Sequence, residues 1–295
     1  MAGDDMKSIE LHINLPFSYW LDRDPKTGVR LQRPTEQAVS EVLRCLTAEM
    51  NSMREDYDDC MLTAIRFLGG YLSLLDAEDL KRLLIVIHRA FHVQSGCPII
   101  GNMFPGHLDM EKIALYRDRN VSPLMFEVPS LSFRECERLG FPVVFQALDK
   151  TVFFLQNFQE GEWGLRLPIG IGGRTEDSWR YVLGQIYHYH PKYLEFFRID
   201  PNLIEEPAFD TICADLQEHG YRRASDTLYA FSDSIPLLLR VPDEAVEYAG
   251  VGPGAESRID GYLAKSTADW ESYRKNAASY RSLITAVKEI TETQE

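Results

Sequence analysis

The chain has 295 residues, of which 45% are hydrophobic and 26% are charged, and this composition is ordinary for a globular protein. Its formal net charge of −14 at pH 7 argues against a nucleic-acid or acidic-membrane partner, because phosphate groups require clustered Lys and Arg. No apolar run approaches the roughly 20 residues that span a bilayer, and residues 1–5 lack the order of a signal peptide. We therefore expect a cytoplasmic protein.

Strand-like and helix-like segments alternate along most of the chain. The expected strands are residues 9–15, 61–68, 98–102, 122–128, 163–169 and 193–199. Four of the expected helices are residues 38–50, 110–118, 142–158 and 175–188. A further helix begins after its N-cap Asp76 and extends to residue 91, and a short helix begins at the capping box of residues 132–135. Six such β/α units in a row predict a parallel sheet, because each crossover returns the chain in the same direction.

Beyond residue 205 the alternation becomes looser. We expect a helix at 207–219, strands at 222–231 and 235–241, a glycine-rich turn at 250–255 and a polar helix at 268–290. No repeat or low-complexity linker interrupts the chain. The sequence therefore predicts a single compact unit, with a main domain at residues 1–204 and a small α+β extension at residues 205–295 packed on it.

The five cysteines are too far apart in the sequence for a metal-binding motif. They are Cys45, Cys60, Cys97, Cys136 and Cys213, and no two lie within five residues of each other. This spacing fits neither a CxxC zinc knuckle nor a CxxxCxxC cluster loop. An odd number of cysteines in a cytoplasmic chain predicts free and mostly buried thiols.

Four segments resemble, in this order and spacing, the oxygen-independent coproporphyrinogen III dehydrogenase family of radical S-adenosylmethionine (SAM) enzymes, which includes haem-chaperone relatives. They are "FLGGYLSLLDAEDLKRLL" (67–84), "PGHLDMEKIALYRDRNV" (105–121), "GIGGRTEDSW" (170–179) and "GVGPGAES" (250–257). The resemblance covers roughly residues 8–280. It implies an α/β fold, a partial (β/α)6 TIM-like barrel of the radical SAM type.

The segment that should carry the family's iron–sulfur cluster lacks its thiolates. The family reads Ile-His-Ile-Pro-Phe-Cys, then three residues, Cys, two residues and Cys. Here "INLPF" (13–17) is kept, but Ser18, Asp22 and Pro25 stand in the three Cys positions. A 4Fe–4S cluster requires soft, anionic Cys thiolates, which these three residues cannot supply together. We therefore expect no iron–sulfur cluster.

Further departures lie where the resemblance places SAM. Gly69 and Gly70 remain from the family's glycine motif, but Leu68 and Tyr71 flank them and should narrow the approach of a ligand. Asn102 stands where the family has a Glu thought to face SAM. The candidate cofactor-binding residues are therefore Gly69, Gly70 and Asn102, with SAM as the candidate cofactor.

The remaining candidates lie at the C-terminal ends of the expected strands, where α/β barrels bind ligands. The candidate catalytic residues are Asp22, Tyr71, Glu127 and Arg166. The candidate substrate-binding residues are Asn14, Trp20 and Arg198.

Each of these candidates also has a purely structural interpretation. Trp20 and Tyr71 would fill the volume that cluster and cofactor vacated. Glu127 and Arg166 would form a buried ion pair, which is costly unless it is well hydrogen-bonded. Arg198 would cap Asp200 at the rim instead of clamping a substrate anion.

No metal site is predicted. His188 and His190 are two residues apart, so their side chains diverge, and they lie at an expected helix C-terminus, where His is favoured. His12 and His107 are expected to be hydrogen-bonded strand or turn residues, with axial haem ligation as the alternative. The turn at 250–255 lacks the order of a phosphate-binding loop and is expected to be structural.

Three functions remain open. The preferred one is a cluster-less barrel that binds a small molecule, with SAM as a candidate, and transforms it by non-radical chemistry in a biosynthetic pathway. The second is a non-catalytic protein partner of a genuine radical SAM enzyme. The third is a haem or tetrapyrrole carrier, which the relatives that handle porphyrins suggest.

Overall fold

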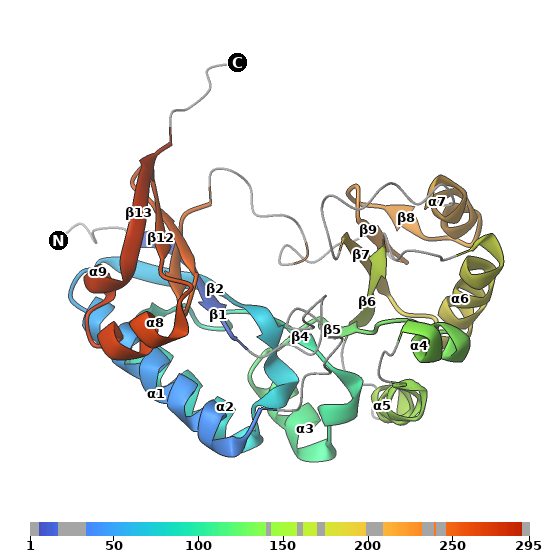
Figure 1. Cartoon of the computed structure of the whole chain (residues 1–295), viewed down its shortest axis with the longest axis horizontal. Coiled ribbons are helices and arrows are strands. Elements are labelled where there is room, and N and C mark those ends of the chain that lie inside the picture. Colours follow the sequence, from blue (N-terminus) through green and yellow to red (C-terminus); the bar gives the residue numbers. More distant parts are fainter. Residues whose placement is uncertain are drawn as a thin grey trace. The chain divides into compact units, whose positions relative to one another are not determined.

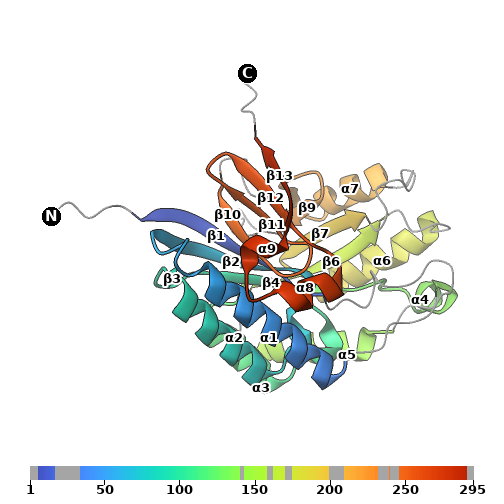
Figure 2. The same cartoon turned by 60° about the vertical axis from the view of Figure 1, so that its left-hand side comes forward.

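The computed structural model describes residues 6–16, 34–139, 143–157, 162–169, 175–198, 209–231, 239 and 246–290. The chain divides into two compact units (Figures 1 and 2). The first comprises Met1–Gly101, Asp118–Val121 and Pro242–Glu295, and the second comprises Asn102–Arg117 and Ser122–Val241. The expected domain boundary between residues 204 and 205 remains a prediction.

The first unit contains a sheet with β1 at its centre. Parallel strands flank β1 (Lys7–Asn14) on both sides, β2 (Cys60–Tyr71) on one and β10 (Tyr248–Val251) on the other. Antiparallel strands continue from β10 through β11 (Glu256–Ile259), β12 (Tyr262–Ser266) and β13 (Ile284–Glu289). The short β3 (His92–Val93) pairs with β2. The two parallel neighbours of β1 therefore come from opposite ends of the chain.

Alternation along β1 decides which face of this sheet is apolar. Leu11 and Ile13 are fully buried, while Glu10, His12 and Asn14 point to the opposite face, because side chains alternate along a strand. Figures 1 and 2 show α1 (Glu36–Met53) and α2 (Ala77–Ala90) side by side along one side of β1 and β2. The apolar stripes of both helices are buried, so this side holds the core of the unit.

The second unit also contains parallel strands that antiparallel strands extend. Its parallel strands are β5 (Leu124–Glu127), β6 (Trp163–Ile169) and β7 (Tyr193–Arg198), followed by antiparallel β9 (Leu228–Ala230) and β8 (Arg222–Arg223). The end of β4 (Ile99–Met103) pairs with β5. The helices of this unit are α3 (Met110–Asp118), α4 (Phe133–Leu139), α5 (Phe145–Asn157), α6 (Glu176–Tyr189) and α7 (Phe209–Glu218).

All six expected parallel strands are present, and the α/β class is confirmed. Asp76 caps α2 as expected, since its side chain accepts a hydrogen bond from the backbone N–H of Asp79 at 2.7 Å. The five thiols are free, and four of them are buried. Among the helices that the structure describes, none is long and apolar enough to cross a bilayer.

The expected polar helix at 268–290 is wrong. This stretch forms two short helices, α8 (Trp270–Asn276) and α9 (Tyr280–Leu283), and then β13, which pairs with β12. The physical reason is local, because Ile284, Thr285 and Val287 are β-branched and lose side-chain freedom in a helix.

Two further predictions about secondary structure beyond residue 205 need correction, and one lies outside the described residues. The strand expected at 222–231 is divided into β8 and β9 by a turn. The strand expected at 235–241 lies outside the described residues, apart from residue 239. The turn expected at 250–255 is shorter, because β10 extends to Val251.

A buried carboxylate joins α1 to the C-terminal part of the first unit. Glu49 on α1 is 1% exposed, and its Oε2 accepts hydrogen bonds from the Gly252 backbone N–H at 2.9 Å and the Tyr273 hydroxyl at 2.6 Å. Burial raises the pKa of Glu49 to about 7, against the effect of both hydrogen bonds. Gly252 has φ +110°, and a Cβ there would lie 2.4 Å from the Asn14 carbonyl oxygen, so the turn requires glycine.

The raised pKa of Glu49 predicts a pH-dependent stability. Because its folded-state pKa of about 7 exceeds the ordinary value of 4.5, the folded state binds the proton more tightly. The free energy of unfolding should therefore fall as pH rises through this interval and stay low above it. Glu49→Gln removes the titration, so its stability relative to the wild type should improve by about 3 kcal/mol between pH 4.5 and pH 8 in urea denaturation.

The control for this measurement is Glu55→Gln, since Glu55 lies exposed just beyond α1. Its stability difference from the wild type should not change over the same pH interval. A Glu49→Gln difference that is equally independent of pH would contradict the assignment of Glu49 as a buried carboxyl group that titrates near neutrality.

Candidate functional site

The predicted site residues divide between the two units. Ser18, Trp20, Asp22 and Pro25 lie outside the described residues, as does the side chain of Arg198. The first unit contains Asn14, Gly69, Gly70 and Tyr71, and the second contains Asn102, Glu127, Arg166 and the backbone of Arg198. The catalytic and binding roles expected of them remain predictions.

In the second unit, three charged residues occupy paired positions on β5, β6 and β7. Arg166 donates from Nη1 to Glu127 Oε2 at 2.6 Å and from Nε to Glu195 Oε2 at 2.7 Å. Its guanidinium also lies over the ring of Phe197, 4.8 Å from the centroid. The alternative expectation of a Glu127–Arg166 ion pair is confirmed. Glu195 was missed, because only the strand register places it opposite Arg166.

This arrangement limits what Arg166 can do. Its guanidinium is already shared between two carboxylates, and Glu127 is 7% exposed. Such a network ties three adjacent strands together, and breaking it would leave a buried charge without its partner. The geometry therefore gives Arg166 a structural role, which is to hold β5, β6 and β7 together.

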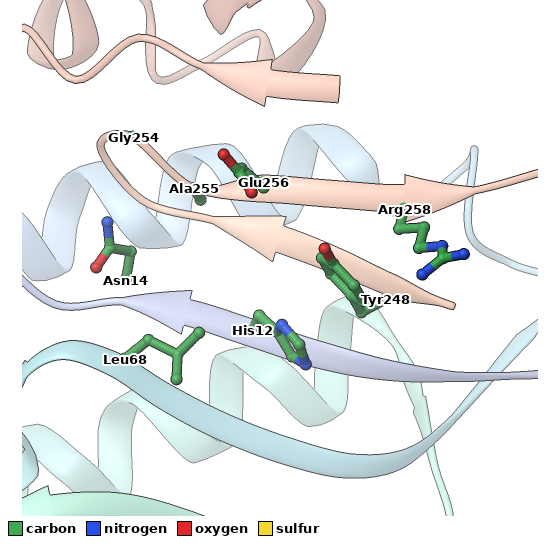
Figure 3. Close-up of a pocket in the computed structure, with 8 residues that line it drawn as sticks. All are labelled: His12, Asn14, Leu68, Tyr248, Gly254, Ala255, Glu256 and Arg258. Carbon is green, nitrogen blue, oxygen red and sulfur yellow. The ribbon is translucent and has the colours of Figure 1, made fainter. Parts of the chain in front are cut away.

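The first unit contains a pocket on the polar face of its sheet. Figure 3 shows the eight residues that line it, which are His12, Asn14, Leu68, Tyr248, Gly254, Ala255, Glu256 and Arg258. Its volume is about 370 Å³, which suits a small molecule. Asn14 and Leu68 lie near the C-terminal ends of β1 and β2, the side of a parallel sheet on which ligands bind.

A buried ionic network forms the floor beside this pocket. Glu10 Oε2 accepts a hydrogen bond from Arg66 Nε at 2.6 Å and lies 2.9 Å from His12 Nε2. Burial alone would raise the pKa of Glu10, but His12 and Arg66 lower it to about 2, so Glu10 is ionised at neutral pH. The His12 ring stacks on Tyr248 with centroids 4.2 Å apart. His12 is thus the hydrogen-bonded strand residue that was expected.

Asn14 closes the pocket at the end of β1. Its Nδ2 donates to the Pro253 carbonyl at 2.6 Å. Gly69 has φ +74°, and a Cβ there would lie 1.9 Å from Asn14 Oδ1. The close approach of Asn14 is therefore one reason for glycine at position 69, independent of any cofactor.

Tyr71 is a member of the core. It is 1% exposed, at the end of β2. This burial agrees with the alternative expectation that Tyr71 fills volume in the interior.

Sequence reasoning missed three residues that line the pocket, Tyr248, Glu256 and Arg258. All three lie on β10 and β11, which were not among the expected strands. A usable signal was present, because Asp260-Gly261 separates two short runs and both residues have positive φ, 52° and 78°. Asp-Gly between strand-like runs is a strong hairpin signal, and it would have placed β11 and β12.

The donor set of this chain does not fit an iron–sulfur cluster. The five thiols belong to five different segments of the chain, and Ser18, Asp22 and Pro25 occupy the positions that the resemblance assigns to thiolates. Within the described ranges, no three His, Cys, Asp or Glu side chains come together to hold a metal ion. No step of chemistry is therefore assigned to such a cluster.

The sequence matches no protein-family model, and a search among curated proteins finds no relative. Among solved structures, the chain is similar to coproporphyrinogen III oxidase (HemN) from Escherichia coli, a radical SAM enzyme. The TM-score is 0.82 at 13% identity, over 98% of this chain and 74% of that chain.

Two further similarities are weaker. One is to anSMEcpe with bound AdoMet, with a TM-score of 0.46 at 10% identity over 72% of this chain and 60% of that chain. The other is to SuiB from Streptococcus suis bound to S-adenosylmethionine, with a TM-score of 0.43 at 10% identity over 72% and 45%. We draw a conclusion from the similarity to HemN alone, and at 13% identity that conclusion concerns the fold. The family resemblance is confirmed at that level: the chain has the TIM-like α/β fold of a radical SAM enzyme.

Proposed function

We propose that this chain is a cluster-less, radical-SAM-like protein that binds a small molecule in the pocket of the first unit and transforms it by non-radical chemistry. SAM is the first ligand to test. The observation that carries the proposal is a pocket of about 370 Å³ on the polar face of β1, β10 and β11, in a chain with a HemN-like fold. The place of this reaction in a biosynthetic pathway is part of the same proposal.

The chemistry of the donor set supports the non-radical part of the proposal. Ser18, Asp22 and Pro25 offer a hydroxyl, a carboxylate and no side-chain donor at all. Iron–sulfur clusters in proteins are held by Cys thiolates, with His in a minority of sites. A hard carboxylate and a neutral hydroxyl do not replace three soft anionic sulfurs.

The lining of the pocket supports the binding part. It presents one guanidinium, one carboxylate, a phenol and an amide beside the apolar Leu68, and this mixture gives both contact area and directional hydrogen bonds. The catalytic roles expected of Asp22, Tyr71, Glu127 and Arg166 are not assigned to this pocket, because Glu127 and Arg166 belong to the second unit, Tyr71 is 1% exposed and Asp22 lies outside the described residues.

The haem-carrier alternative gains no support from His12. Its Nε2 already faces Glu10, and its ring is stacked against Tyr248. Axial ligation would disturb both contacts. The alternative of a protein partner is an outcome that the experiments below would favour if no ligand bound.

The first prediction is that SAM binds in the pocket. Calorimetry should give saturable heat, and SAM well above its dissociation constant should raise the melting temperature by several degrees through linkage. Leu68→Trp should abolish both effects, because Leu68 lines the pocket and is 42% exposed, so the larger side chain can occupy the cavity.

The matched control is Ile85→Trp, on the exposed side of α2 in the same unit, where the native side chain is 50% exposed. This variant should bind SAM as the wild type does. Absence of heat at millimolar SAM would remove SAM as the ligand, and undiminished binding by Leu68→Trp would place the site elsewhere.

The second prediction concerns the cluster. Anaerobic reconstitution with iron and sulfide should leave the wild type without stoichiometric iron and without the brown absorbance of a cluster. The variant Ser18→Cys/Asp22→Cys/Pro25→Cys restores the thiolate spacing and serves as the positive control, with about four irons per chain expected. About four irons in the wild type would overturn the non-radical proposal.

A further inference from the structure

Two hydrogen-bond donors meet on the wall of the pocket. Tyr248 on β10 and Arg258 on β11 are directly paired across antiparallel strands, so their side chains leave the sheet on the same face. Both residues line the pocket, and Figure 3 shows them on neighbouring strands, with His12 beside Tyr248. A ligand in the pocket therefore meets a phenol and a guanidinium together.

Neither group has a hydrogen-bond or ion-pair partner among the described residues. In the part of the chain that the structure describes, no hydrogen bond or ion pair engages the Arg258 guanidinium or the Tyr248 hydroxyl. Arg is charged at any physiological pH. Burial raises the pKa of Tyr248, so its hydroxyl keeps its proton at neutral pH and can donate it in a hydrogen bond.

The other charges around the pocket are compensated. Glu256 accepts a hydrogen bond from Lys265 at 2.9 Å, and on the floor Glu10 is held by Arg66. The guanidinium of Arg258 also lines the pocket, and no such pair with a described residue compensates its charge. In a chain with a formal net charge of −14, a cation on a pocket wall without an ion-pair partner among the described residues marks a position where an anionic ligand can bind.

We propose that Arg258 and Tyr248 form an anion clamp that binds a carboxylate or phosphate group of the pocket's ligand. A guanidinium offers parallel N–H donors that match the oxygens of either group, and the phenol adds a further donor. His12 positions the Tyr248 ring from beneath by stacking. The inference rests on the proposed function only in that it uses the same pocket, and it names the class of ligand which that pocket takes.

The experiment uses three small probes with one ring in common. Benzoate and phenyl phosphate carry the two anions, and benzamide is the uncharged counterpart of benzoate. Ligand-detected NMR titrations of the full chain give their affinities. We expect the better anion to bind about tenfold more tightly than benzamide, the size of one charge-assisted contact. The order of benzoate and phenyl phosphate then distinguishes a carboxylate ligand from a phosphate ligand.

The variants assign that preference to the clamp. Arg258→Gln should reduce anion affinity to that of benzamide, and Tyr248→Phe should weaken it about threefold while keeping the ring. Arg258→Lys, which keeps the charge but not the fork, should lie between them. The matched control is Arg180→Gln, an exposed residue of α6 in the second unit that loses the same charge and should bind the anions as the wild type does. Circular dichroism checks that each variant is folded.

The outcomes separate this inference from the proposed function. Equal affinity for benzoate, phenyl phosphate and benzamide, or an anion preference that survives Arg258→Gln, overturns the clamp whether or not SAM binds. A complete lack of anion binding at 50 mM of each probe, about the weakest affinity of interest for one such contact, overturns it as well. An Arg258-dependent anion preference without any heat from SAM supports the clamp and removes SAM as the ligand.

Discussion

The first unit depends on the parallel pairing of β1 with β10. Eight residues near the start of the chain, Lys7–Asn14, lie between β2 and a strand that begins at Tyr248. Because side chains alternate, the same strand that buries Leu11 and Ile13 against the helices presents Glu10, His12 and Asn14 on its other face. Without β10, Glu10 and His12 would lose the strand that brings Tyr248 beside them, and the pocket would have no wall.

That pairing is held by contacts outside the sheet. Glu49 on α1 accepts the Gly252 N–H, and Asn14 donates to the Pro253 carbonyl, so the turn after β10 is bound from the helix side and from the strand side at once. Glycine at position 69 leaves room for the Asn14 side chain, and glycine at position 252 leaves room for the Asn14 carbonyl oxygen. The glycine-rich turn is structural, as the sequence indicated, and its position also makes it part of the pocket wall.

How much of the structure could be predicted from the sequence depends on how far apart in the chain the residues lie that carry each signal. The repeated β/α pattern is local, so strands such as residues 163–169 and the cap at Asp76 were readable. Glu195 was not, because its place beside Arg166 depends on register between strands. Arg258 was missed for a different reason: the Asp260-Gly261 hairpin signal was present, but residues 256–267 were assigned to no expected element.

The residues that hold β1 in the fold differ from those that stand in the positions which the resemblance assigns to thiolates. The side chains that hold β1 in place end at Leu15, which is fully buried and whose N–H donates to the Leu68 carbonyl at 2.8 Å. The positions that the resemblance assigns to thiolates begin only at residue 18, after the strand. The buried contacts of β1 that the structure describes come from the apolar core and from the paired charges of Glu10 and Arg66, which supply its stability.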